Sequence, residues 1–517
     1  MRKLLVLLLL VQQGWAQQSA SSAISPGMPA DSLSVYNPVL TPAAMKDDLQ
    51  LFLNIRKKAN SGLYRYRTKK QIDSIYKWAF KEVKKPMPTL DFFKIILQLT
   101  DFEGSCHNYT EPHADLVAYL NRQRGFFPYV MKYIDGKMIF NSKTSQIPVG
   151  ARVLSINGIR DTTLMQSFYK YMTADGYVMT QKQSGSVNRS YGMRYLYEYG
   201  VNDSFRIRFT APGQDNIQEV IAPAISLEER KASVKARYSA PVDSIIDYNL
   251  QPTYSFRMID SSTGLLNLRI FSMARDADDP AFPVYVAFID SVFRVLDSNK
   301  VPHLVLDIRG NPGGSDPNFE QPMMYLTDKD FKENTLAYTI FGDQIPYEQY
   351  FWGISTAARM DSAELIAGKQ MLQDYFPLLK DGRNIQNAKY NPVYHPKQPG
   401  FKGKLYMLID EDVASAGSHL ASLVKAYARN LTIIGVETVG GYYYHNGHMP
   451  MIYELPHSKI KTKFSIVYVL QDAPYKPDQP DGRGIIPDYT VWPSFDDFMQ
   501  NRDTQMEYVL RLIREGK

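Results

Sequence analysis

The stretch that decides the fold is His303-Leu-Val-Leu-Asp-Ile-Arg-Gly-Asn-Pro-Gly-Gly314. Its first six residues, 303–308, are mainly apolar and run into turn residues, which predicts a buried strand. The loop that follows is rich in glycine. Glycine has no Cβ, so the backbone N–H groups of such a loop are open to a bound anion or oxyanion. Taken alone, the loop is more typical of an ordinary tight turn than of a functional site.

The sequence on both sides alternates between strand and helix patterns. Residues 253–259 and 265–271 predict a hairpin, and 405–409 and 431–436 predict two further strands. Apolar residues recur at helical spacing between these strands, at Val284, Phe288, Val292 and Val295 and again at Leu420, Leu423, Val424 and Tyr427. Repeated βαβ units predict an α/β domain with its functional groups at the strand ends.

Two more segments of this region carry candidate chemistry. Val413-Ala-Ser-Ala-Gly-Ser418 lies between a predicted strand and a predicted helix. A serine there feels the positive end of the helix dipole, although the same position suits a plain N-cap. Asp481-Gly-Arg-Gly-Ile-Ile-Pro-Asp488 by itself predicts a turn followed by a strand.

In this order and spacing the segments resemble the serine peptidases of the C-terminal-processing and tricorn-protease group. The group's pattern is D-x-R-x-N-x-G-G, then S-A at a helix start, then G-x-x-T-x-G, then G-I/V-x-P-D. Here these are Asp307–Gly314, Ser415-Ala416, Gly435–Gly440 and Gly484–Asp488. The resemblance covers about 250–494 and implies a crotonase-like ββαβ catalytic core with Ser415 as the nucleophile.

The group uses two catalytic schemes. Processing peptidases pair the serine with a lysine directly after T-x-G, where this chain has Gly441. The tricorn-like scheme instead implies His107 as the base and Asp481 as the acid. Histidine suits the base role because its pKa lies near neutrality, and a carboxylate fixes its tautomer. Asp478 or Asp472 is an alternative acid.

The resemblance also assigns the groups around the reacting atoms. The backbone N–H groups of Gly313 or Gly314 and of Ala416 would hold the oxyanion. The tricorn-like pattern has a serine just before the histidine, where this chain has Cys106. Cys106 therefore joins the catalytic set as its fourth member, and a cysteine beside a histidine is also a conceivable nucleophile.

The front of the chain adds two modules. Residues 46–125 predict helices, including a capping box formed by Thr68 and Gln71. The segment Gly150–Gly158 resembles the G-D-x-I-x-x-I-N-G strand of a PDZ domain, with Ala151 in place of the aspartate. A PDZ-like module adds a peptide strand to a sheet edge. The expected divisions are a leader (1–16), a flexible lead-in (17–45), a helical domain (46–125), a β-rich PDZ-like domain (126–215), a linker (216–250), the α/β catalytic domain (251–494) and a C-terminal helix (495–517).

Composition sets the remaining limits. Arg2 and Lys3, the apolar run 4–11, and small Gly14 and Ala16 predict an exported protein cleaved after Ala16. The net charge of +6 is spread along the chain, so nucleic acid is not an expected partner. The single cysteine excludes an internal disulfide. No later run is long enough to span a bilayer, so stable membrane insertion is not expected.

The sequence therefore predicts an exported serine peptidase that acts on peptides or unfolded proteins, without a cofactor. No metal is expected, because neither H-E-x-x-H nor cysteine pairs accompany His445, His448 and His457. Two other readings stay open: a protein on this fold that binds hydrophobic ligands, as retinoid-binding relatives do, and an inactive peptide-binding scaffold.

Overall fold

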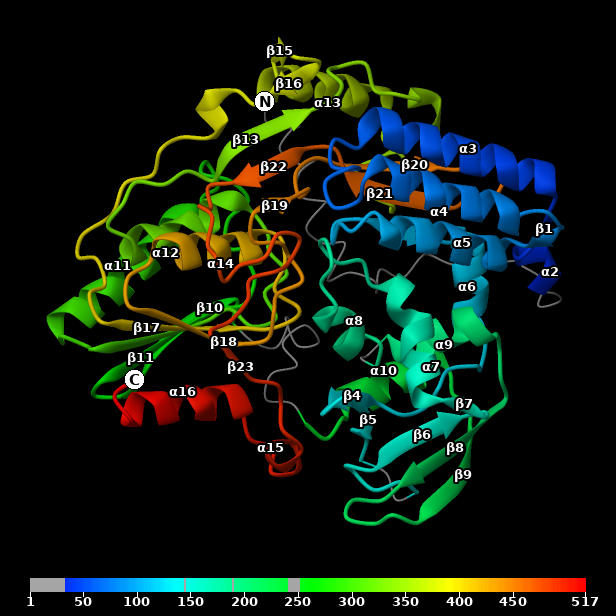
Figure 1. Ribbon diagram of the computed structural model, residues 1–517, viewed down its shortest axis with the longest axis horizontal. Helices are drawn as coiled ribbons and strands as arrows, with labels where there is room; N and C mark the ends of the chain where they lie inside the picture. The colour runs from blue at the N-terminus through cyan, green and yellow to red at the C-terminus, as the bar shows by residue number, and fades with distance from the viewer. Residues whose placement is uncertain (1–32, 144–145, 188–189, 240–251) are drawn as a thin grey trace.

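The computed structural model describes residues 33–517 except 144–145, 188–189 and 240–251 (Figure 1). The predicted leader, 1–16, and the lead-in up to residue 32 lie outside the described residues. The rest of the lead-in forms a short helix, α2 (Leu33–Tyr36), a two-residue strand, β1 (Val39–Leu40), and the start of the next helix. Within the described residues, no helix is both long and apolar enough to cross a membrane.

Four helices form the predicted helical head. They are α3 (Pro42–Ala59), α4 (Lys69–Glu82), α5 (Thr89–Phe102) and α6 (Ala114–Arg122). The Thr68–Gln71 capping box is present at the start of α4, which confirms that prediction. The hydroxyl of Thr89 donates to the carbonyl of Pro38 and so ties the start of α5 to the chain just after α2. Helix α5 presents a nearly continuous buried face, as its apolar spacing requires.

The β-rich module is one sheet in the order β4-β5-β6-β8-β9, with the short β7 against β6. Its strands are β4 (Met131–Ile134), β5 (Lys137–Phe140), β6 (Arg152–Ile156), β7 (Ile159–Arg160), β8 (Ser204–Thr210) and β9 (Ile217–Pro223). Helices α7 (Asp161–Phe168), α8 (Thr180–Gly185) and α9 (Tyr191–Tyr199) fall inside a segment that was expected to be mostly strands. The prediction of a linker at 216–250 is wrong for its first part. Residues Ile217–Pro223 form strand β9, which pairs with β8 over seven residues, and helix α10 (Leu227–Lys235) follows.

The predicted α/β unit is built on a six-stranded sheet in the order β10-β11-β12-β17-β18-β23. The strands are β10 (Tyr254–Asp260), β11 (Thr263–Leu268), β12 (His303–Asp307), β17 (Lys404–Ile409), β18 (Leu431–Gly435) and β23 (Tyr489–Thr490). Only the β10–β11 pair is antiparallel, which confirms the predicted hairpin. Parallel strands place their carboxyl ends at one edge, so the loops after β12 and β17 meet there.

Helices cover both faces of this sheet (Figure 1). Helices α11 (Phe282–Ser298), α12 (Glu320–Leu326) and α14 (Ala416–Tyr427) pack on one face through a large apolar core. Helix α16 (Thr504–Arg514) packs on the other face through Val509 and Leu512. The predicted single C-terminal helix is therefore two helices, since α15 (Phe495–Met499) precedes α16.

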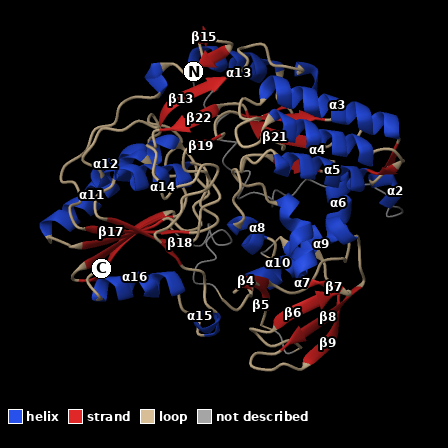
Figure 2. Cartoon of the chain, in the orientation of Figure 1, coloured by secondary structure: helices blue, strands red, loops and turns tan. Residues whose placement is uncertain are grey.

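The catalytic unit and the helical head share one hydrophobic core. A long excursion between β12 and β17 forms β13 (Asn334–Thr339), β14 (Phe351–Gly353), α13 (Ser362–Tyr375), β15 (Leu378–Lys380) and β16 (Arg383–Ile385). Its strands build two sheets, β15-β16-β13-β22-β19 and β14-β20-β21-β3, together with the late strands β19 (Tyr444–His445), β20 (Pro450–Glu454), β21 (Lys461–Ser465) and β22 (Tyr468–Gln471). Strand β3 (Tyr109–Glu111) of the head completes the second of these sheets beside β21. Their common core joins α3, α4 and α5 to β20 and β21 (Figure 2). The boundary expected at residue 125 therefore does not separate the head from the catalytic unit.

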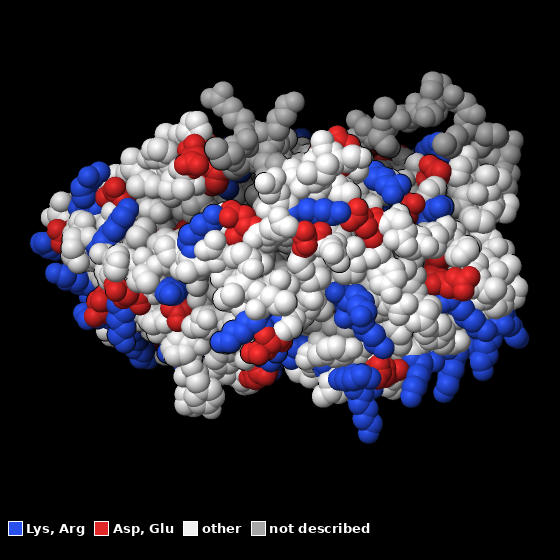
Figure 3. Space-filling model, turned by 90° about the horizontal axis from the view of Figure 1, so that it is seen from above, with Lys and Arg blue, Asp and Glu red and all other residues white. Residues whose placement is uncertain are grey.

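The surface carries both signs of charge. On the face seen in Figure 3, Asp and Glu lie among Lys and Arg over most of the area, and Lys and Arg gather along the lower margin. This distribution agrees with a modest net charge that is spread along the chain.

Candidate active site

Ser415 lies at the turn between β17 and α14 and holds a strained backbone conformation. Its φ is 51° and its ψ is −130°, a region that residues with a Cβ rarely adopt. Ala414 and Ala416 on either side are buried, whereas Ser415 is half-buried. Its side chain makes no capping hydrogen bond to the helix. The strain is therefore not explained by capping, and the turn presents a free hydroxyl.

The glycine-rich loop packs directly on this serine. A Cβ placed on Gly313 would lie 2.5 Å from the Cβ of Ser415 and 2.8 Å from the backbone nitrogen of Ala416. The φ angles of Gly313 and Gly314 are 101° and 144°, which favour glycine. A larger residue at 313 would push the loop away from Ser415.

The two predicted oxyanion donors in the loop are not equivalent. The Gly313 N–H donates to Asn311 Oδ1 at 2.8 Å, so it is already used. The N–H groups of Gly314 and Ala416 donate to no residue in the part of the chain that the structure describes. The geometry therefore favours Gly314 and Ala416 as the open pair.

The rest of the D-x-R-x-N pattern holds the loop in place. Arg309 is buried and forms ion pairs of 2.7 Å with both Asp307 and Asp503, which lies just before α16. Asn311 donates to the Leu268 carbonyl at 2.9 Å, which anchors the loop to the end of β11. These charged and polar groups are structural, since all their contacts are internal.

Cys106 and His107 lie in the loop between α5 and β3. The Cys106 Sγ is 3.4 Å from His107 Nδ1. The backbone N–H of Ser415 also reaches the Cys106 thiol, which brings the predicted nucleophile beside this loop. Burial raises the pKa of the thiol well above its usual value, so it stays protonated. That state argues against Cys106 as a nucleophile.

His107 is neutral and only partly engaged. Burial, with Lys463 and His448 nearby, lowers its pKa to about 3. Its Nε2 is buried without a hydrogen-bond partner and faces Gly447, where a Cβ would lie 3.2 Å away. Among the described residues, no hydrogen bond joins His107 to Ser415.

The carboxylate that faces Cys106 and His107 is Asp175, which the sequence analysis did not single out. Asp175 accepts the Cys106 N–H at 2.8 Å and the Gly441 N–H at 2.9 Å. One ligand-type atom each of Cys106, His107 and Asp175 lies within 4.8 Å of the other two. Burial raises the Asp175 pKa to about 6. The only local signal was an Asp-Gly pair, which indicated a turn and nothing more.

Asp481, the predicted acid, points elsewhere. Its side chain is 68% exposed and forms an ion pair of 2.6 Å with Arg65. It makes no hydrogen bond to His107 in the described structure. The next residue, Gly482, accepts the Tyr177 N–H at 2.8 Å, so this turn packs against the outside of the Asp175 segment.

The two alternative acids are also engaged away from His107. Asp478 is exposed and pairs with Lys425 at 3.3 Å. Asp472 accepts the Lys332 N–H at 2.9 Å. Asp175 is thus the carboxylate that the tertiary structure places at the histidine.

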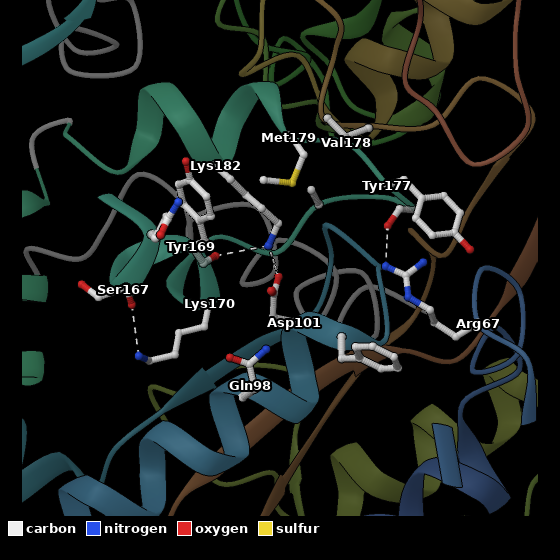
Figure 4. Close-up of a pocket in the computed structure, with 14 residues that line it drawn as sticks. Arg67, Gln98, Asp101, Ser167, Tyr169, Lys170, Tyr177, Val178, Met179 and Lys182 are labelled. Carbon is white, nitrogen blue, oxygen red and sulfur yellow. Dashed lines mark hydrogen bonds and ion pairs between the residues drawn. The ribbon is translucent and has the colours of Figure 1, made fainter. Parts of the chain in front are cut away.

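A cavity of about 670 Å³ lies behind the Asp175 segment (Figure 4). Figure 4 shows Lys182 reaching Asp101 across it and Arg67 donating to the Gly176 carbonyl, in the turn that carries Tyr177. Neither Ser415 nor His107 lines this cavity. It separates the head from the β-rich module and does not adjoin the reacting groups.

The fold and the site define a class: a mixed α/β core that presents a strained serine to a glycine-rich loop, with a histidine from a helical head nearby. The family model for peptidase family S41 matches residues 280–491. The matched segment, which holds the glycine-rich loop and Ser415, is therefore a domain of peptidase family S41, a family of serine peptidases. No curated protein matches the chain.

Solved structures of CPAF share the fold over almost the whole chain. CPAF complexed with lactacystin is 14% identical, with a TM-score of 0.57 over 91% of this chain and 98% of that chain. A serine-to-alanine mutant of CPAF is 15% identical, with a TM-score of 0.60 over the same shares. Mature CPAF is 14% identical, with a TM-score of 0.54 over 90% and 96%. The head and the β-rich module are thus part of a shared arrangement.

Proposed function

We propose that this serine peptidase cleaves peptide bonds with Ser415 as nucleophile, His107 as general base and a buried carboxylate behind the histidine. The observation that carries the proposal is the strained, uncapped Ser415 packed against Gly313, with the open N–H groups of Gly314 and Ala416 adjacent in the two loops. Backbone strain of this kind is concentrated at functional sites, where the surrounding structure maintains it.

The chemical steps follow from these positions. Ser415 Oγ attacks the scissile carbonyl while His107 accepts its proton. The Gly314 and Ala416 N–H groups stabilise the oxyanion that forms. His107 then donates its proton to the leaving amine, and water repeats the sequence to release the acyl group. Because the His107 Nε2 has no partner in this structure, substrate binding is the step that turns it toward Ser415, as catalytic contacts often tighten only in the complex.

Asp175 is the better-supported acid. It is buried and accepts the backbone N–H of Cys106, which holds that backbone in place. The Cys106 thiol bridges Asp175 and the histidine and can pass a hydrogen bond between them. An ionised Asp175 would stabilise the imidazolium that forms during the attack. Asp481 stays a prediction that would require the Arg65 ion pair to open.

Three further parts of the proposal concern delivery of substrate. The crotonase-like core would supply the nucleophile and the oxyanion hole. The β-rich module would act as a PDZ-like domain that takes up a peptide strand; its edge strand β9 exposes Ile217 and Ile221, which suits strand addition. Export through the predicted leader would place the enzyme in a periplasm or outside the cell, where its substrates are peptides or unfolded proteins.

The test is a fluorophosphonate probe and an unfolded protein substrate, applied to the full chain and to Ser415→Ala. We expect labelling and cleavage in the parent and neither in the variant. Binding of unfolded protein by the parent without any labelling would instead identify a peptide-binding scaffold. The matched control is Ser418→Ala, because the Ser418 hydroxyl donates to the Ser415 carbonyl and lies on the same helix turn.

A further inference from the structure

Three potential metal ligands from distant parts of the chain meet beside the glycine-rich loop. Asp316 follows that loop directly, Glu333 precedes β13, and His448 lies between β19 and β20. One ligand atom of each lies within 4.8 Å of the other two. His448 Nδ1 is 3.7 Å from Asp316 Oδ2. The group is separate from the Ser415 and His107 site, although Gly447 adjoins both His107 and His448.

Two buried side chains next to this group have an atom without a partner. Glu320 is 1% exposed; its Oε1 accepts from Tyr394 at 3.0 Å, and its Oε2 has no hydrogen-bond partner. The Glu320 carboxyl faces that of Glu333, and the two share the Tyr394 hydroxyl. His445 is 6% exposed, and its Nε2 is also unpartnered, with its ring centre 5.4 Å from that of His448. Buried polar atoms are rarely left unpaired without a functional reason.

The group also lacks positive charge. Asp316, Glu320 and Glu333 lie together, and among the described residues their one ion-pair partner is His448. A bound cation would supply the missing positive charge and would use the free oxygen of Glu320.

We propose that Asp316, Glu333 and His448 bind a divalent transition-metal ion, with Glu320 as a fourth ligand. One imidazole nitrogen with carboxylate oxygens is a donor set that suits Zn²⁺ and, less tightly, Mn²⁺. Zinc bonds of about 2.0–2.1 Å place ligand atoms about 3.3 Å apart in a tetrahedron, so the three atoms need to close by about 1.5 Å at most. His419 Nε2 donates to the Glu333 carbonyl at 2.7 Å and so holds the backbone of Glu333 in place.

The ion would connect the active site to the rest of the fold. Asp316 is two residues after Gly314, one of the proposed oxyanion donors. His448 is next to Gly447, which abuts the unpartnered Nε2 of His107. Bound metal would therefore fix the loop on each side of the scissile bond. No metal was expected from the sequence because it has neither an H-E-x-x-H motif nor cysteine pairs. Residues 316, 333 and 448 lie too far apart in the chain to form a recognisable metal-binding motif.

The experiment is a calorimetric titration of the EDTA-treated full chain with ZnCl₂, together with metal analysis after dialysis. We expect one zinc per chain with release of a proton, and a zinc-dependent rise in the melting temperature. Glu333→Gln and His448→Gln should each weaken zinc binding at least tenfold. Glu333→Gln removes a buried charge, so without metal it should melt no lower than the parent, which excludes misfolding as the cause. The measurement does not depend on Ser415 being the nucleophile.

The control is His395→Gln, which removes a histidine from an exposed pair with Asp330 at 2.9 Å. Zinc binding should be unchanged in it. The proposal is overturned if the parent binds no zinc, or if binding is lost in Cys106→Ala and kept in Glu333→Gln, which would move the ion to the catalytic cysteine and histidine. A second result would also overturn the proposal. If zinc does not bind and Glu333→Gln abolishes a preference for substrates with lysine or arginine, the carboxylates bind a positively charged substrate side chain instead of a metal ion.

Discussion

Gly441 donates its backbone N–H to Asp175 Oδ2 at 2.9 Å. Position 441 is where the processing peptidases that this sequence resembles carry their catalytic lysine. A Cβ on Gly441 would lie 2.6 Å from the Tyr444 carbonyl and 3.0 Å from the Tyr66 hydroxyl, so no side chain fits there. The space that a lysine side chain would occupy in a Ser–Lys enzyme thus adjoins Asp175, an aspartate from the β-rich module. The presence of a carboxylate and the absence of a lysine at this point support a mechanism in which His107 is the base.

Ser415→Ala should abolish turnover and probe labelling and leave stability unchanged. The Ser415 side chain makes no capping hydrogen bond, so its removal does not cost the roughly 1 kcal/mol of stability that a capping serine contributes. Alanine also tolerates the same backbone angles no worse than serine does. Labelling by a fluorophosphonate and thermal unfolding measure the two effects. Labelling that persists in Ser415→Ala and disappears in Ser418→Ala would transfer the nucleophile to Ser418.

His107→Ala should reduce kcat by roughly 10³-fold or more with the fold intact, as the loss of a triad base does. The matched variant is Lys463→Met, because Lys463 lies near His107 and burial lowers its pKa. Single-turnover assays on the same peptide compare the two. If Lys463→Met is inactive and His107→Ala is active, the base is the lysine and the histidine scheme fails.

Asp175→Asn should lower kcat by roughly 10²–10⁴-fold with a smaller change in KM, because the negative charge acts mainly on the imidazolium of the transition state. Asp481→Asn should stay within a few-fold of the parent, since that carboxylate pairs with Arg65 at the surface. Cys106→Ser should keep most activity, because a hydroxyl can replace the thiol between Asp175 and His107. A loss in Asp481→Asn as large as that expected for Asp175→Asn would instead assign the role of the acid to Asp481.

Asp175 also predicts a pH dependence of stability. Its pKa is about 6 in the folded state, above the ordinary 3.8, so the folded state holds the proton more tightly. Stability from this group is therefore fully present below about pH 4 and is lost as the pH rises to about 6. The parent should lose up to about 3 kcal/mol of unfolding free energy between pH 4 and pH 7 through this group, and Asp175→Asn should not show this loss. Urea unfolding at pH 4, 5.5 and 7 measures the difference, and parallel curves for the two proteins would contradict it.

Arg56→Met should destabilise the chain by about 3–5 kcal/mol. Arg56 is fully buried, donates to Glu103 at 2.9 Å and to Thr462 at 2.7 Å, and so links α3 to β21. Its loss leaves the buried Glu103 carboxylate without its cation, although the Asn108 amide still donates to it. The control is Arg124→Met, whose partner Glu229 is at the surface, with an expected cost below about 1 kcal/mol. A small effect for both would mean that the head and the catalytic unit are not held by this contact.

Much of the catalytic core could be predicted from residues close together in the sequence. Runs 303–308 and 405–409 are short and almost entirely apolar, and they form buried parallel strands. A run of that length is typical of a strand that is covered on both faces. The glycines after β12 and the serine before α14 follow directly from their strands, so their meeting at one sheet edge was predictable. The Thr68–Gln71 cap was equally local.

The excursion between β12 and β17 was not predictable in the same way. Its strands are short, and its first strand, β13, pairs with β22, which lies more than a hundred positions away. A two- to six-residue strand has little periodicity of its own, so its identity depends on its partner. The same reason explains why 217–223 was expected to be a linker, since β9 is defined by pairing with β8.

The sequence by itself determined the class of protein and predicted Ser415 as its nucleophile, because the motifs around Gly313 and Ser415 are contiguous and each element needs only its neighbours. Only the tertiary structure decided which carboxylate stands behind His107 and which residues surround Glu333. Those contacts join loops from separate modules, at residues 107, 175 and 441 and at 316, 333 and 448. Loop positions carry no repeating pattern, and their meeting depends on how whole layers pack. As a result, Asp175 accepts a hydrogen bond from Cys106, whereas Asp481 lies at the surface and pairs with Arg65.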